Sequence, residues 1–341
     1  MATERIISAE ALPTDEPSVS VSLRPQRLGE FIGQNDLRER LQIALEAAQH
    51  RDEPMDHVLL HGPPGLGKTT LAYVIANEME ARACITSGPA LTRPSDLAGT
   101  LTKLEAHDVL FIDEIHRLPA AVEEYIYPAM EDYRIDVTVD QGLHAKVFTL
   151  NLRPFTLIGA TTRSGLLTGA LRSRFGITHH LDFYPADDLL DILGAAAPQL
   201  GLDNTDPSAL NAIATRSRGT PRIALRLLRR VRDFSLVRAN GAMSEQVVID
   251  ALALEGVDEL GLDALDRAYL RTVAQIYEGG PVGVEAIAAT IGEDSGTLED
   301  VVEPYLLQLG FLARTRQGRR LTTAGGGYVG ASGMPLFRNK T

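Results

Sequence analysis

Residues 62–70 read Gly-Pro-Pro-Gly-Leu-Gly-Lys-Thr-Thr, and this stretch constrains the fold more than any other. It follows a short apolar run at 57–61 and precedes the apolar segment 71–78, which predicts a strand, a glycine-rich loop and a helix. A triphosphate needs several backbone N–H groups pointing inward, and glycine lets the chain curl that tightly. We expect Lys68 to reach the β- and γ-phosphates and the Thr69 hydroxyl to ligate Mg²⁺. A plain glycine-rich turn with an exposed lysine is the alternative, and the flanking strand and helix favour the nucleotide site.

Two carboxylates, Asp113 and Glu114, end the apolar run at 108–112. Continuous apolarity is typical of a strand buried on both faces of a parallel sheet. At the end of such a strand, Asp113 is expected to hold Mg²⁺ through water, and Glu114 to polarise the attacking water as a general base. The alternative is that both acids cap the helix that follows. A further apolar run at 155–161 ends beside Thr162, whose hydroxyl could bind the attacking water or the γ-phosphate.

The order of apolar runs and helical patterns predicts a doubly wound α/β sheet followed by two smaller units. We expect five strands, at 57–61, 84–87, 108–112, 155–161 and 177–182. Residues 1–20 and 331–341 are expected to be tails, and the ordered units are expected at 21–184, 185–256 (all helical) and 257–330. The last unit, with three helices and a hairpin, predicts a winged helix.

A predicted β-hairpin at 133–150 interrupts the α/β pattern. Both of its runs alternate between apolar and polar residues around a glycine-bearing turn at 140–142. Apolar side chains that project from the hairpin would mark a partner site, whereas buried ones would only extend the sheet. We favour the partner site.

The predicted wing carries four arginines and no acid, whereas the preceding helix at 295–309 carries three acids that DNA phosphates would repel. This favours contact with phosphates through the wing and predicts binding without base preference. The wing arginines are Arg314, Arg316, Arg319 and Arg320.

Arginine is also dense between residues 216 and 238, where eight arginines accompany a single acid, Asp233. Such a helix face is often simply solvated. However, Arg222 falls in the first turn of a predicted helix, where a positive group opposes the helix dipole, and an anion there would offset that cost.

Composition limits the remaining possibilities. The formal net charge of −12 argues against a broadly basic surface, so any contact with nucleic acid must come from a local patch. Cys84 is the only cysteine, which excludes an internal disulfide and fits a reducing cytoplasm, where we expect the protein. We expect no structural zinc and, because no apolar run approaches ~20 residues, no membrane partner.

Seven strings together resemble AAA+ ATPases and, more narrowly, the RuvB family of bacterial Holliday junction branch migration motors. They are Arg-Pro at 24–25, Gly-Gln at 33–34, the loop at 62–70, Asp-Val-Leu-Phe-Ile-Asp-Glu-Ile-His-Arg at 108–117, Gly-Ala-Thr-Thr-Arg at 159–163, Leu-Arg-Ser-Arg-Phe-Gly at 171–176 and Gly-Thr-Pro-Arg-Ile at 219–223. The resemblance implies an AAA+ P-loop domain with a five-stranded parallel sheet, a helical lid and a winged-helix DNA-binding domain.

The resemblance also implies roles that spacing does not give. Thr162 would be the first sensor, Arg222 the second, and Arg174 an arginine finger entering the site of the neighbouring subunit. The adenine pocket would be lined by Leu23, Arg24 and Tyr184, with Glu131, Asp132 and Tyr133 nearby. Gly65, Lys68, Thr69 and Thr70 would complete the ATP-binding set, with Mg²⁺ at Thr69 and Asp113. Arg314 and Arg319, with Arg316 beside them, would contact DNA.

The function implied is an ATP-driven motor that moves Holliday junctions in recombination and repair. It would work as a homohexamer around duplex DNA, with RuvA docked on the 133–150 hairpin and RuvC resolvase as a further candidate partner. A clamp-loader-like or initiator-like AAA+ switch is the alternative. A non-catalytic nucleotide-binding scaffold is opposed by the intact set Lys68, Thr69, Asp113 and Glu114.

Overall fold

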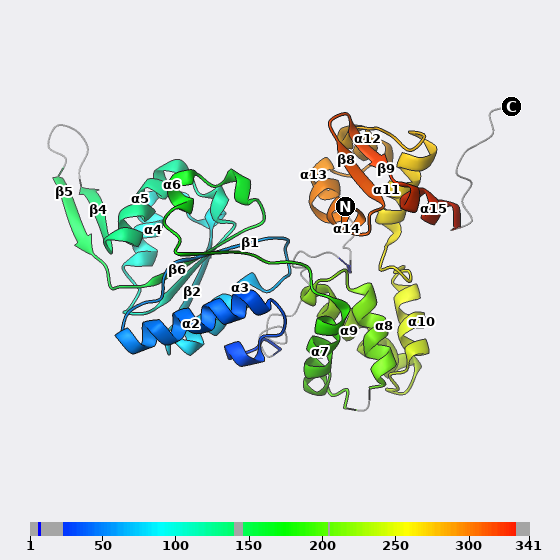
Figure 1. Ribbon diagram of the computed structural model, residues 1–341, viewed down its shortest axis with the longest axis horizontal. Helices are drawn as coiled ribbons and strands as arrows, with labels where there is room; N and C mark the ends of the chain where they lie inside the picture. Colours follow the sequence, from blue (N-terminus) through cyan, green and yellow to red (C-terminus); the bar gives the residue numbers. More distant parts are fainter. Residues whose placement is uncertain (1–5, 8–22, 140–145, 204, 332–341) are drawn as a thin grey trace. The chain divides into compact units, whose positions relative to one another are not determined.

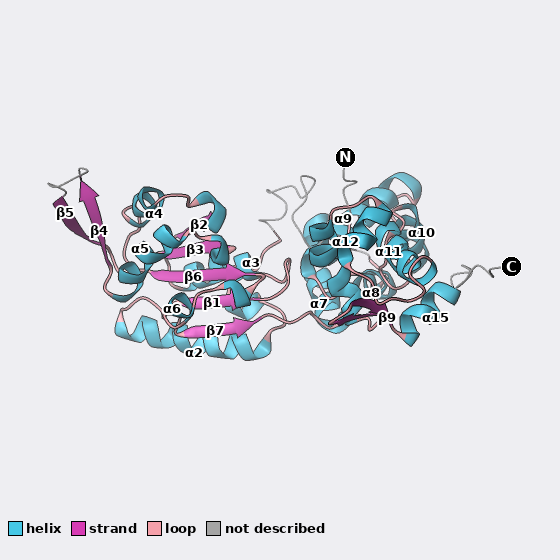
Figure 2. Ribbon diagram, turned by 90° about the horizontal axis from the view of Figure 1, so that it is seen from above, coloured by secondary structure: helices cyan, strands magenta, loops and turns pink. Residues whose placement is uncertain are grey.

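A parallel sheet of five strands forms the centre of the N-terminal half of the chain (Figure 2). The computed structural model describes residues 6–7, 23–139, 146–203 and 205–331. The strands lie in the order β2-β3-β6-β1-β7, and all neighbours are parallel. Their bounds are β1 (Val58–His61), β2 (Ala83–Ser87), β3 (Val109–Asp113), β6 (Thr156–Thr161) and β7 (Ile177–His180). The predicted five-stranded parallel sheet is therefore confirmed.

Helices cover both faces of this sheet (Figure 1). One face carries α2 (Asn35–Arg51) and α3 (Lys68–Glu78), and the other carries α4 (Pro94–Leu101), α5 (Ala120–Glu131) and α6 (Gly169–Arg172). Because helices cover the three inner strands on both faces, β1, β3 and β6 are buried along almost their full length. Their uninterrupted apolar sequences follow from this burial on two sides.

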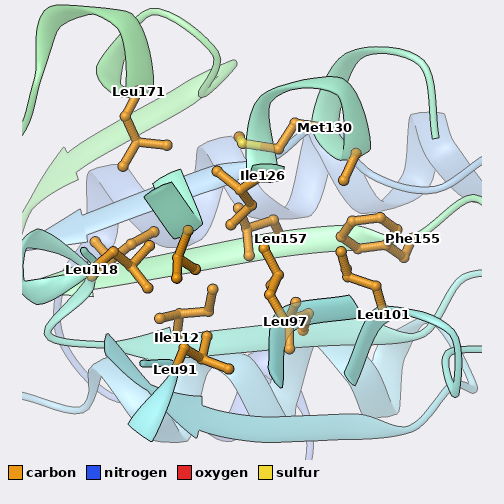
Figure 3. Packing of buried hydrophobic residues seen from close by; sticks show 14 of the residues in the cluster. Leu91, Leu97, Leu101, Ile112, Leu118, Ile126, Met130, Phe155, Leu157 and Leu171 are labelled. Carbon is orange, nitrogen blue, oxygen red and sulfur yellow. The ribbon is translucent and has the colours of Figure 1, made fainter. Parts of the chain in front are cut away.

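The core between the sheet and α4, α5 and α6 is mainly aliphatic, with the rings of Phe155 and Phe175 among the buried side chains (Figure 3). Leu97 and Leu101 of α4 and Ile126 of α5 face Leu157 of β6, and Phe155 closes the end of the cluster. Burying an aliphatic side chain of this kind contributes about 1.5–3 kcal/mol relative to leaving it exposed. This layer fixes α5 and α6 against the sheet.

The hairpin of β4 (Arg134–Val139) and β5 (Lys146–Asn151) is an antiparallel pair of its own and is not joined to the central sheet. It projects away from that sheet (Figure 1). Ile135 at its base is buried, whereas Phe148 and Leu150 on β5 are 51% and 42% exposed. The expected turn at 140–142 lies outside the described residues.

The C-terminal half begins with the helices α7 (Ala186–Ala196), α8 (Pro207–Arg216), α9 (Pro221–Arg238) and α10 (Glu245–Leu254). The winged helix follows, and its first two helices are α11 (Ala264–Gln275) and α12 (Val284–Ile291). Its third helical run consists of α13 (Ser295–Thr297), the π-helical η6 (Leu298–Val302) and α14 (Glu303–Gln308). The wing strands are β8 (Leu312–Thr315) and β9 (Gly318–Leu321). The chain forms two compact units, residues 17–184 and residues 1–16 with 185–341. Each unit is described by itself.

Two segments of this second unit differ from the expectations. Residues 6 and 7 do not behave as part of a loose tail, because Ile7 is only 1% exposed and the Ile6 carbonyl accepts a hydrogen bond from Arg226 Nη1 at 2.9 Å. The helix α15 (Thr323–Ala331) was not expected, since three consecutive glycines disfavour a helix. A Cβ on Gly325 would lie 2.3 Å from the Phe311 carbonyl oxygen, so this close approach requires glycine. None of the helices described is long and apolar enough to cross a membrane.

His57, which precedes β1, connects three elements in the interior of the ATPase domain. Its Nδ1 accepts a hydrogen bond from the Leu157 amide at 2.9 Å, so its Nε2 carries the proton and donates to the Met130 carbonyl at 3.0 Å. Burial of the ring lowers its pKa below the usual 6.5. The neutral tautomer is therefore part of the folded structure.

We predict that the free energy of unfolding of this protein falls as the pH is lowered through about 6.5. The unfolded chain takes up a proton on His57 that the folded chain resists, so acid favours unfolding. Burial lowers the pKa of His61, His116 and His179 in the same direction. Denaturant titrations between pH 7.5 and 5.5 measure the loss, and His57→Gln should make it smaller because an amide does not titrate. Equal slopes in both proteins would contradict this assignment.

Candidate nucleotide site and wing

The loop between β1 and α3 has a backbone that only glycine adopts readily. Gly62, Gly65 and Gly67 have φ of +138°, +79° and +99°. A Cβ on Gly62 would also lie 2.5 Å from the Leu181 carbonyl oxygen. The three glycines therefore allow the left-handed backbone conformation of this loop, as expected for a loop that wraps a phosphate.

Lys68 is the first residue of α3 and lies inside this loop. It is 7% exposed, and its Nζ donates to the carbonyl oxygens of Gly62 and Pro63, both at 2.7 Å. Thr69 and Thr70 follow in the first turn of the 11-residue helix, where unpaired amides and the helix dipole favour an anion. The exposed-lysine alternative is wrong, because the ammonium group is buried within the loop.

Two further segments lie against the loop and its helix. The Tyr184 hydroxyl donates to the Leu66 carbonyl at 3.2 Å, and a Cβ on Gly67 would lie 3.3 Å from the Phe31 ring. The Arg24 guanidinium lies over the ring of Tyr73 on α3, 5.2 Å from its centroid. The segment that carries Leu23 and Arg24 thus lies along α3, on the same unit as Tyr184.

The carboxylates occupy the carboxyl edge of the sheet, the edge where the strands end. Asp113 is the last residue of β3, and its Oδ1 accepts a hydrogen bond from the Glu114 amide at 3.0 Å. The Thr162 hydroxyl lies 3.2 Å from both carboxylate oxygens of Glu114. Glu114 precedes a short 3-10 turn but makes no side-chain capping bond to it. The capping alternative therefore fails for Glu114, which pairs with Thr162 instead.

His116, to which the sequence motifs assign no role, belongs to the same cluster. Its Nδ1 lies 3.1 Å from Glu114 Oε2 and 2.8 Å from Thr161 Oγ1. Burial lowers the pKa of His116, which keeps the ring neutral near pH 7. The only signal in the sequence is its place two residues after Glu114.

Arg174 lies at the opposite, amino edge of the sheet, three residues before β7 begins. Its Nη2 is 3.2 Å from Glu131 Oε1 at the end of α5, and its Nη1 donates to the Ala170 carbonyl at 2.5 Å. Strands of four to six residues separate the two edges by about 13–20 Å. Arg174 therefore cannot reach the phosphate loop of its own chain.

Within one chain, Glu131, Asp132 and Tyr133 do not lie beside Leu23, Arg24 and Tyr184, so their expected place near the adenine pocket stays a prediction. The Tyr133 carbonyl accepts a hydrogen bond from the Leu152 amide at 2.7 Å. The Tyr133 ring packs edge-on against the ring of Phe155, which precedes β6. All three residues lie at the amino edge, with Arg174, because α5 runs from the carboxyl edge of the sheet to the amino edge. Arg222, in the first turn of α9, belongs to the other unit of the chain.

In the wing, two of the three predicted DNA-binding arginines are held by acids of the helix behind them. Glu303 is fully buried and accepts from Tyr269 Oη at 2.9 Å, Arg314 Nε at 2.6 Å and Arg319 Nε at 2.9 Å. Arg319 also pairs with Glu299, and its side chain is only 17% exposed. Arg316, at the tip, is exposed. The acids at 299 and 303 thus neutralise the base of the wing.

Three family models match successive parts of the chain. They are described as the Holliday junction DNA helicase RuvB P-loop domain (residues 23–181), the RuvB AAA lid domain (184–258) and the RuvB C-terminal winged helix domain (259–330). The ranges together cover nearly all residues between 23 and 330.

Solved structures of RuvB from Thermotoga maritima are similar over most of their length. One mutant is 49% identical with a TM-score of 0.83, covering 91% of this chain and 98% of that one. A second mutant is 48% identical with a TM-score of 0.82, covering 92% and 99%. A structure described as the RuvB Holliday junction branch migration motor is 49% identical with a TM-score of 0.81, covering 90% and 98%. The chain therefore belongs to the RuvB family of Holliday junction DNA helicases.

Proposed function

We propose that this protein is an AAA+ ATPase that drives branch migration of Holliday junctions in recombination and repair, with ATP bound between two copies of the chain. The observation that carries the proposal is the separation of Lys68 and Glu114 from Arg174 by the length of the sheet. An arginine finger at the far edge can act only on a nucleotide held by a neighbour. Family membership favours this motor over a clamp-loader-like switch.

At the carboxyl edge, the loop amides and Lys68 would bind the β- and γ-phosphates, and Thr69 and Asp113 would hold Mg²⁺. When bound, the metal supplies charge neutralisation on the phosphate oxygens. The glycine backbone around Lys68 and the oxygen donors at Thr69 and Asp113 fit this group. Leu23, Arg24 and Tyr184 are the proposed adenine contacts, with Gly65 and Thr70 in the loop and Arg222 as the second sensor.

Glu114 accepts the proton of the attacking water as general base. Its carboxylate is presented by a backbone in the left-handed region, with φ of +48°, and is oriented by Thr162 and His116. Because burial keeps His116 neutral, no imidazolium pairs with the Glu114 carboxylate on that side. Thr162, as the first sensor, can exchange its bond to Glu114 for one to the water or the γ-phosphate.

Glu131, Asp132, Tyr133 and Arg174 form the complementary half of the site, which meets the nucleotide of the adjacent subunit. A finger supplied in trans is worth about 10³–10⁵ in rate in comparable systems. Hydrolysis therefore requires assembly, and we propose a homohexameric ring, in keeping with the family resemblance.

The proposed partners follow from the same resemblance. Duplex DNA at the junction binds through the wing, and RuvA docks on the hairpin, where Phe148 and Leu150 expose apolar surface. RuvC resolvase is a further proposed partner, and the cytoplasm is the proposed compartment.

Glu114→Gln should retain ATP binding and lose turnover, because the amide cannot accept the proton but keeps the shape of the side chain. Steady-state ATPase assays and calorimetric ATP binding measure the two properties separately. Glu124→Gln, on the exposed face of α5, is the matched control and should behave as wild type. Undiminished turnover in Glu114→Gln would refute the role of Glu114.

Arg174→Ala should lower turnover by about 10³-fold or more with ATP affinity retained. Mixing it with Lys68→Ala subunits tests the location of the finger. Each Arg174→Ala subunit keeps an intact phosphate loop that a Lys68→Ala neighbour can complete with its own Arg174. Partial recovery of activity in the mixture is expected, and a mixture no more active than its components would contradict a site shared between subunits.

Arg316→Ala should weaken DNA binding about equally across sequences and reduce the slope of log affinity against log salt by about one. Its melting temperature should be unchanged, because Arg316 is exposed at the wing tip. Arg319→Ala should instead lower the melting temperature, since it removes a donor from the buried Glu303 carboxylate. Gln317→Ala is the control at the same tip. Loss of binding confined to particular sequences would argue against phosphate contact.

A further inference from the structure

The guanidinium of Arg174 lies on the face of an aromatic ring. Its central carbon is 4.2 Å from the centroid of the Tyr127 ring, on α5, within the distance at which cation and ring attract each other. Figure 1 shows α5 and α6, the helices that carry the ring and lead to the arginine, beside each other. The proposed role of Arg174 as a finger does not by itself require this stacking.

The remaining contacts of Arg174 fix only part of the group. Nη1 donates to the Ala170 carbonyl and Nη2 pairs with Glu131, whereas Nε is buried with no hydrogen-bond partner among the described residues. The ring below the guanidinium is therefore a further contact that restrains its plane. Stacking on a face leaves the N–H groups at the edge available to an anion, which a hydrogen-bonding partner in the same place would not do.

Tyr127 is itself held in place by both helices. Its hydroxyl donates to Glu123 Oε1, which also accepts from the Thr168 hydroxyl. Thr168 caps α6 by accepting from the Leu171 amide at 3.1 Å. Burial and the neighbouring Glu123 raise the pKa of Tyr127, so the phenol stays a donor. The ring thus links α5 to the start of the short helix that leads into Arg174.

We propose that Tyr127 is a positioning residue that holds the Arg174 guanidinium ready for the γ-phosphate of the neighbouring subunit. This inference rests on the proposed role of Arg174 as a finger in trans. An arginine side chain loses considerable rotamer freedom when it is fixed, and a ring that fixes it in advance reduces the cost at the transition state. Tyr127 touches Arg174 and need not touch the nucleotide.

Tyr127→Leu should lower kcat by about three- to thirtyfold, the range that corresponds to the loss of one cation–π contact. The KM for ATP should be unchanged, because the phosphate loop lies at the other edge of the sheet. Tyr127→Phe keeps the ring and loses the hydroxyl, and it should retain most of kcat. A Tyr127→Leu protein with wild-type kcat, or a Tyr127→Phe protein as impaired as Tyr127→Leu, would overturn the inference.

A double variant separates positioning from general damage to the fold. In the Arg174→Ala background, Tyr127→Leu should cause no further loss of kcat, because the group that it positions is already gone. An additional loss of similar size would show that Tyr127 acts through the stability of the domain and would overturn the inference. The comparison of kcat in the Arg174→Ala background remains decisive even if the Tyr127→Leu protein melts at a lower temperature.

Mixed rings distinguish a failure of this inference from a failure of the proposed function. Lys68→Ala subunits should rescue Arg174→Ala subunits, and Lys68→Ala/Tyr127→Leu subunits should rescue them about three- to thirtyfold less. Equal rescue by both would overturn the role of Tyr127 and leave the shared site intact. Absence of rescue by Lys68→Ala itself would overturn the shared site, and the inference with it.

Discussion

The parallel pairing of the central sheet is the constraint on which the rest of the site depends. When all strands run the same way, their carboxyl ends meet at one edge and their amino ends at the other. The phosphate loop, Asp113, Glu114 and Thr162 all follow strand ends and therefore gather at the first edge. Arg174 and Glu131 precede or face strand beginnings and gather at the second. The two groups cannot meet within one chain.

The proposed chemistry follows from this separation. The carboxyl edge has what is needed to bind a triphosphate and orient a water, and the proposed finger would add an arginine that neutralises charge as the terminal phosphate leaves. The amino edge has such an arginine, stacked on Tyr127 and paired with Glu131. A second copy of the chain would bring the two edges together, so turnover and subunit contact become one event. That coupling is how a ring could convert hydrolysis into movement of DNA.

Much of this could be predicted from the sequence, because strand ends are marked by motifs. The loop at 62–70, the Asp113–Glu114 pair and Thr162 each follow an apolar run, so their convergence required only the parallel sheet. The position of residues 131–133 could not be predicted, since a helix of unknown direction and length carries them across the sheet. The roles of His116 and Tyr127 could not be predicted, because each contacts a residue that is distant in sequence, Thr161 and Arg174 respectively. The hydrogen bond between Arg319 and the buried Glu303 is likewise a tertiary contact, which a count of charges does not reveal. The three consecutive glycines in α15 argue against a helix by their low helix propensity. The segment is helical all the same, and its Gly325 packs closely against the Phe311 backbone.

The most direct measurement is electron cryo-microscopy of the protein assembled on a four-way junction with a non-hydrolysable ATP analogue and Mg²⁺. We predict that each nucleotide lies between two subunits, with Lys68 and Glu114 of one subunit on one side and the guanidinium of Arg174 from its neighbour within hydrogen-bond distance of the γ-phosphate. Nucleotides enclosed by a single chain, with every Arg174 remote from phosphate in the assembled ring, would contradict it.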